Sequence, residues 1–113
     1  MSMDTSLRTL KTAITAGGYE YAYNVFPLDD GAPAFPYLTA VVTNGTASLF
    51  ADDINYYDTM YVELSLFTKE KQPATEDAIR AILKNLELDY EWTENYVETQ
   101  KFYQIIYRFT MDA

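Results

Sequence analysis

The ten residues 59–68, TMYVELSLFT, alternate apolar and polar side chains more cleanly than any other part of the chain. Met60, Val62, Leu64 and Leu66 fall on one side of an extended backbone, and mostly polar residues fall on the other. Because successive side chains of a strand point to opposite faces, this pattern predicts a strand with one buried face. We expect it to lie at the centre of a sheet, with its leucines packed beneath helices.

Two segments have the spacing of amphipathic helices. In residues 5–16, apolar side chains recur at intervals of three and four, and Gly17-Gly18 supplies a stop. In residues 74–88, an apolar stripe follows Pro73, which suits the first turn of a helix. The stripes consist of Leu7, Leu10 and Ile14 in the first helix and of Ile79, Ile82, Leu83 and Leu86 in the second.

Strand patterns also occur in residues 18–26, 37–43, 90–98 and 101–111. Asn44-Gly45 is typical of a tight turn, and residues 46–57 are interpreted as a protruding loop or a ragged hairpin end. The predicted order is helix, strand, strand, strand, helix, strand, strand within a single domain, residues 1–113. This order favours an α+β fold, with a mainly antiparallel sheet and both helices packed on one face.

Composition limits the chemistry that is expected. The chain has 113 residues with no Cys and no His, so thiolate zinc sites and histidine-based catalysis are excluded. The formal charge is −9, and the eight Lys and Arg residues form no patch that would bind DNA phosphates. We expect no cofactor, no metal and no enzymatic activity, and we expect neither a signal peptide nor a membrane span.

Two carboxylate pairs remain as candidates for chemistry. Asp29-Asp30 precede Gly31, and Asp52-Asp53 precede Ile54. Each pair could bind a hard cation or act as a general acid and base, although neither has the spacing of a calcium-binding loop. Since Asp readily ends strands and begins turns, solvated turns are the favoured interpretation.

Eleven tyrosines are the most unusual feature of the composition. Stacked aromatic side chains can bind single-stranded nucleic acid, but such sites carry Lys or Arg, and here the neighbours are acidic. Tyrosine combines apolar area with a hydroxyl group, which suits protein interfaces. We therefore assign about half of the tyrosines to packing within the protein and the other half to contacts with other proteins.

Three segments together resemble a known family: FADDINYY at 50–57, YVELSLFTKEK at 61–71 and YQIIYRF at 103–109. The opening, with a short helix, a strand and a proline-rich loop that runs into Pro36-Tyr37, resembles the same family. The chain is similar to tail terminator, or tail completion, proteins of long non-contractile-tailed phages and prophages of Gram-positive bacteria.

The resemblance implies a sheet flanked by helices and a ring of subunits, typically a hexamer. The ring would cap the phage tail tube at its head-proximal end and join it to the head-tail connector after assembly in the host cytoplasm. The implied partners are other copies of the chain, the tail tube protein and the connector protein, while DNA passes without specific binding.

Two hypotheses assign residues to this role. Phe50, Tyr56 and Tyr57 are expected at the interface between subunits, because they flank a broken strand pattern. Asp29, Asp30, Asp52 and Asp53 are expected to line an acidic lumen or to form a docking loop. The alternatives are another small head-tail connector or minor capsid subunit, an acidic inhibitor that mimics DNA, and, least favoured, an enzyme that uses carboxylates alone.

Overall fold

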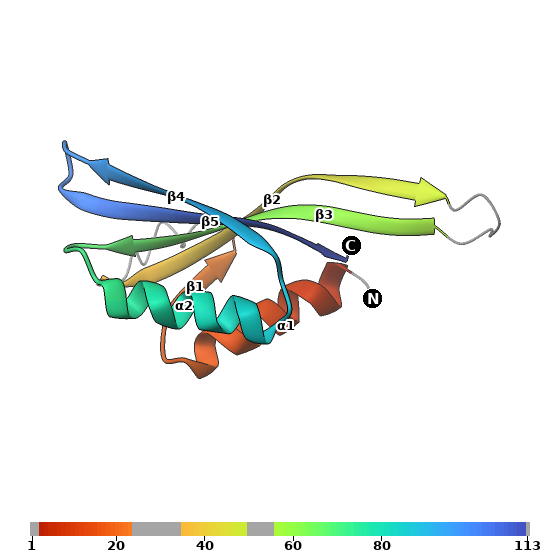
Figure 1. Ribbon diagram of the computed structural model, residues 1–113, viewed down its shortest axis with the longest axis horizontal. Coiled ribbons are helices and arrows are strands. Elements are labelled where there is room, and N and C mark those ends of the chain that lie inside the picture. The colour runs from red at the N-terminus through yellow and green to blue at the C-terminus, as the bar shows by residue number, and fades with distance from the viewer. Residues whose placement is uncertain (1–2, 24–34, 50–55, 113) are drawn as a thin grey trace.

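The computed structural model describes residues 3–23, 35–49 and 56–112, and it describes the side chains of this set except those of 46–49 and 56–57. It confirms an α+β fold with two helices and a five-stranded, mainly antiparallel sheet (Figure 1). The elements are α1 (Met3–Ala16), β1 (Glu20–Tyr23), β2 (Tyr37–Leu49), β3 (Tyr56–Thr68), α2 (Pro73–Asn85), β4 (Tyr90–Val97) and β5 (Phe102–Asp112).

The strand order across the sheet is β1-β2-β3-β5-β4, so β3 is the central strand, as its sequence predicts. All neighbouring strands are antiparallel except β1 and β2, which run parallel. A parallel pair needs a connection of about a dozen residues, and residues 24–36 between these strands are long enough for it.

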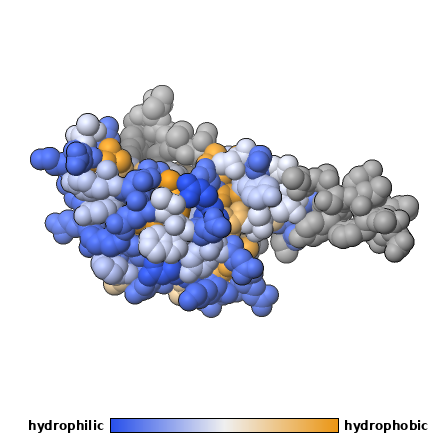
Figure 2. Space-filling model, turned by 45° about the horizontal axis from the view of Figure 1, so that its top comes forward, coloured by the Kyte–Doolittle hydropathy of each residue, from blue (hydrophilic) through white to orange (hydrophobic). Residues whose placement is uncertain are grey.

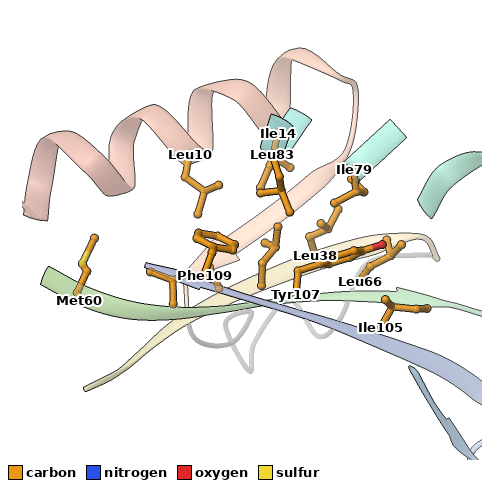
Figure 3. Packing of buried hydrophobic residues seen from close by; sticks show 13 residues of the cluster. Leu10, Ile14, Leu38, Met60, Leu66, Ile79, Leu83, Ile105, Tyr107 and Phe109 are labelled. Carbon is orange, nitrogen blue, oxygen red and sulfur yellow. The ribbon is translucent and has the colours of Figure 1, made fainter. Parts of the chain in front are cut away.

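The alternation in β3 is confirmed. Leu64 and Leu66 are fully buried on the side of the helices, where they pair in register with Tyr107 and Ile105 of β5. Figure 3 shows the side chains of both helices pointing toward this face. The buried cluster contains Leu10 and Ile14 of α1, Ile79 and Leu83 of α2, and Leu38, Ala40, Met60, Val62, Leu64, Leu66, Ile105, Tyr107 and Phe109 of the sheet.

Both helices lie on the same side of the sheet, but they do not cover that side completely (Figure 1). Trp92 and Tyr96 of β4 share a face with the buried Tyr107 and with Tyr103, their partners in β5. They nevertheless stay about half exposed. The outer strand on this edge therefore extends past the helical layer.

The predicted turn at Asn44-Gly45 is wrong. Both residues lie inside the ladder between β2 and β3, where they pair with Tyr61 and Met60. The register shifts between Val42 and Asn44, so the local signal marks a β-bulge and not a chain reversal. Glycine is required at position 45 for a different reason, because a Cβ there would lie 2.8 Å from the Thr59 carbonyl oxygen.

The strands consequently extend into residues 46–57, which were interpreted as a protruding loop or a ragged hairpin end, and β2 and β3 remain paired as far as Leu49 and Tyr56. The ladder between β3 and β5 ends with the pair Thr59 and Asp112. Residues 47–49 and 56–58 therefore form a two-stranded extension beyond the last pair with β5, here called the arm. Figure 1 shows this hairpin projecting past the helices.

The molecule is elongated along the direction of the arm. Its principal extents are 52 × 31 × 27 Å and its radius of gyration is 15.4 Å. A compact chain of this length would have a radius of gyration of about 13 Å. In the part of the chain that the structure describes, no helix is both long and apolar enough to cross a membrane.

Candidate assembly surface

The residues predicted to form interface and lumen lie mostly outside the described residues. This applies to Phe50 and to all four aspartates, Asp29, Asp30, Asp52 and Asp53. Tyr56 and Tyr57 have a described backbone, which opens β3 in the arm, but their side chains lie outside the described set. The backbone thus places the two tyrosines on the arm, and the interface hypothesis itself stays a prediction.

The sheet face opposite the helices, here called the second face, carries a cluster of four aromatic rings that sequence reasoning missed. Tyr37 of β2 stacks on Phe67 of β3, with 4.9 Å between ring centroids. Phe35 lies 5.4 Å from Tyr37 and 5.9 Å from Phe102, which in turn contacts Phe67 edge-on at 5.8 Å. Burial raises the pKa of Tyr37. The available signal was the position of Phe67 among the polar, outward residues of β3.

A hollow of about 550 Å³ lies near the bulge. Arg108 of β5 is the cation in its wall: Nε donates to Glu63 Oε2 at 3.2 Å, and a terminal nitrogen donates to Thr93 Oγ1 at 2.9 Å. The lining residues are Thr43, Asn44, Tyr61, Val62, Glu63, Asp89, Tyr90, Glu91, Arg108, Phe109 and Thr110. Its lining contains three carboxylates, of Glu63, Asp89 and Glu91, and one guanidinium, so the hollow suits contact with a cation, and among its described lining residues no nucleophile is paired with a base.

A buried ion pair ties α2 to the edge of the sheet. Glu76 is almost fully buried in the first turn of α2, and Lys71 Nζ lies 2.9 and 2.8 Å from its two carboxylate oxygens. Lys71 also contacts Glu94 of β4. Hydrogen bonds to Glu76 and Glu94 raise the pKa of Lys71. The lysine therefore holds one buried and one half-exposed carboxylate together.

The described tyrosines separate into three groups. Tyr107 is fully buried, and its hydroxyl group has no partner among the described residues. Five others are half-buried against the core or in aromatic contacts: Tyr19, Tyr21, Tyr37, Tyr90 and Tyr103. Tyr23, Tyr61 and Tyr96 are exposed. Packing within the protein thus accounts for about two-thirds of the described tyrosine side chains, more than the half that was expected.

Within the described ranges, no three His, Cys, Asp or Glu side chains gather to hold a metal ion. Ser6 lies on the buried side of α1, and Ser65 accepts a hydrogen bond from Gln104, so neither faces a general base among the described residues. No protein-family model and no curated protein matches the sequence. The surfaces themselves, namely the arm, the second face and the outer strand β4, are therefore the features from which function is argued.

Proposed function

We propose that the chain is a structural virion subunit: a tail terminator that forms a ring, closes the phage tail tube and joins it to the head connector. The arm is the observation that carries this proposal. A two-stranded hairpin is at best marginally stable in water when nothing packs against it. Here the β2–β3 ladder continues for three further pairs after β5 has ended.

Such an extension is expected to pack on another subunit. It extends along the direction of β2 and β3, while β4 is an outer edge strand of the sheet. A contact between the arm of one copy and a different surface of the next copy is heterologous, and heterologous contacts close into rings when the rotation permits. The resemblance of the sequence to tail terminators supports the same arrangement, with the hexamer as the expected ring.

The proposal is tested by shortening the arm. Residues 47–58 are replaced by Asn-Gly, which joins the paired residues Thr46 and Thr59 by a two-residue hairpin turn. The shortened chain keeps every pair between β3 and β5. We expect it to fold, as judged by circular dichroism, and to lose the closed oligomer that native mass spectrometry detects in the full chain.

A second variant changes side chains of the arm and keeps its backbone, so it tests the side chains alone. Tyr56→Ser combined with Tyr57→Ser should leave the circular dichroism spectrum intact and abolish the higher oligomer. Loss of folding would instead place these tyrosines in the core. A full-length chain that remains a monomer or dimer until a nuclease or another DNA-binding protein is added would favour the acidic inhibitor.

The lumen hypothesis needs the assembled particle. Replacing Asp52 and Asp53 with Lys would add cations to the channel, and each cation gains affinity for DNA by releasing counterions from the duplex. We expect particles to form and DNA delivery to fall, measured as the ratio of infectious units to completed particles after complementation. Normal infectivity would contradict the assignment of Asp52 and Asp53 to the lumen. A failure of heads to join tails would instead indicate that these residues belong to a docking surface.

A further inference from the structure

The outer strand β4 is an open sheet edge. It pairs with β5 on one side through eight consecutive residues without a register shift, and no described strand pairs with its other side. Natural proteins protect such edges with prolines, charged side chains, bulges or very short strands. β4 has no proline, lysine or bulge and its only charges are Glu91 and Glu94, whereas the opposite edge, β1, is only four residues long.

Two large aromatic side chains stand on this edge. Trp92 is 51% exposed and Tyr96 is 48% exposed, and both project to the side of the sheet that bears the helices. Tyr96 packs on Tyr103 of β5 with ring centroids 4.8 Å apart. Aromatic side chains in this state are typical of the buried centre of protein interfaces.

We propose that β4 pairs antiparallel with β4 of a second copy, around a two-fold axis that passes beside Glu94. A two-fold axis perpendicular to the sheet keeps both helical layers on the same side and forms one continuous sheet of ten strands. In this register, the numbers of two residues that face each other across the interface add up to 188. Trp92 of each copy is then the direct cross-strand neighbour of Tyr96 of the other copy, and the two aromatic pairs flank the axis symmetrically.

The charges at the axis fit this register. Glu94 faces Glu94 of the other copy, and like charges directly opposite each other destabilise a sheet. Here each Glu94 already contacts Lys71, which reaches it from the loop before α2. The lysines, each shared with Glu76 of its own copy, therefore place positive charge beside both carboxylates. On the second face, Thr93 meets Asn95, a neutral and polar pair.

This contact goes beyond the proposed function and does not depend on it. β4 is the outermost strand of the sheet, whereas the arm continues β2 and β3 beyond their last pair with β5, so an isologous β4 contact and a heterologous arm contact use separate surfaces. The arm-shortened chain should still form the β4 dimer, whereas variants of β4 should lose the dimer and keep the arm. Failure of either proposal is thus recognisable independently of the other.

The first test is sedimentation equilibrium of the full chain and of the arm-shortened chain, in which the β4 dimer is the only oligomer expected. Trp92→Ser combined with Tyr96→Ser should weaken the dimer about ten- to a hundredfold, since two symmetric aromatic pairs are lost. Tyr23→Ser is the matched control, because Tyr23 is equally exposed, at 48%, on the opposite edge strand. The dimer of the Tyr23→Ser variant should be as stable as that of the wild type. A wild-type chain that stays monomeric at its highest soluble concentration, or equal weakening by the control, overturns the proposal.

The second test uses the absence of cysteine from the chain and does not depend on the aromatic variants folding. In single-cysteine variants at positions 93, 94 and 95, only Glu94→Cys brings its thiol next to its own copy across the axis, within the reach of a disulfide. We expect mild oxidation to cross-link Glu94→Cys at least about tenfold faster than Thr93→Cys or Asn95→Cys. Equal rates at the three positions would reject this register.

Discussion

At the scale of single residues, the helix-facing half of β3 determines stability. Leu64 is fully buried in the core cluster, on the side of β3 that faces the helices. Leu64→Ala should lower the free energy of unfolding by roughly 2–5 kcal/mol, because it removes apolar contacts and leaves a cavity. Urea denaturation measures this loss, and Tyr61→Ala, on the exposed side of the same strand, is the control. A loss below about half a kilocalorie for Leu64→Ala would contradict the role assigned to this position.

Tyr107 and Lys71 are expected to make the folded state less stable at alkaline pH. Burial, and then the charge of Glu76, raise the pKa of the Tyr107 phenol above its ordinary value, and hydrogen bonds to two carboxylates raise the pKa of Lys71. Both groups bind a proton more tightly in the folded state. Their stabilising contribution is therefore complete below the unfolded-state pKa, near 10, and is lost as the pH rises through the folded-state values.

We expect the melting temperature to be constant between about pH 7 and pH 9 and to fall above about pH 10. Tyr107→Phe should reduce this fall. At pH 7 the same variant should change the free energy of unfolding by less than about 1 kcal/mol, since the hydroxyl group it removes is buried without a described partner. An unchanged alkaline transition in the variant would show that Tyr107 does not contribute to it. Differential scanning calorimetry provides both measurements.

At the scale of elements, Gly45 allows the two strands of the hairpin to approach each other. Gly45→Ala would place a methyl group 2.8 Å from a backbone oxygen of β3, and backbone cannot turn away as a side chain can. We expect a loss of about 1–3 kcal/mol. In Gly17→Ala the nearest atom, at 3.1 Å, belongs to the movable ring of Tyr19, so this control should be nearly neutral. Comparable losses in both variants would contradict the close-approach argument.

Alternation and helical spacing were sufficient to predict the two helices, the central strand and the terminal hairpin, because burial on one face leaves a periodic pattern. The end of β2 could not be predicted in this way. Asn44-Gly45 has the local chemistry of a turn, but cross-strand pairing with Tyr61 and Met60 overrides it. The parallel pairing of β1 with β2 depends on contacts distant in sequence, and no local pattern encodes it.

The candidate site was less predictable than the fold. The aromatic cluster around Phe67 brings together residues from three separate segments, and only the register of the sheet makes them neighbours. Trp92 and Tyr96 likewise become candidates for an interface only once β4 is known to be an edge strand. Sequence patterns show which residues alternate, but they do not show which strand ends the sheet.

At the scale of the whole molecule, charge opposes every contact between copies. Each chain carries −9, so the proposed β4 dimer and the proposed arm-mediated ring would both have to overcome repulsion. Salt reduces that repulsion, since the screening length falls from about 30 Å at 0.01 M to about 8 Å at 0.15 M. We expect association to strengthen as sodium chloride is raised over this range, and analytical ultracentrifugation measures the change. Weaker association at higher salt would indicate that specific ion pairs, such as Lys71 with Glu94, dominate instead.

The bulge at Thr43 bears on how many subunits a ring of this protein would contain. Val42 pairs with Val62 and Asn44 with Tyr61, so Thr43 is the one extra residue in β2. A bulge bends and twists its strand, and deleting Thr43 would therefore redirect the arm while Asn44 and Gly45 kept their partners. In a circular assembly, the angle from one copy to the next divides a full turn and fixes how many copies close it. A single codon could thus change the number of subunits in a ring without changing any contacting side chain, and native mass spectrometry of the deletion variant would show that number directly.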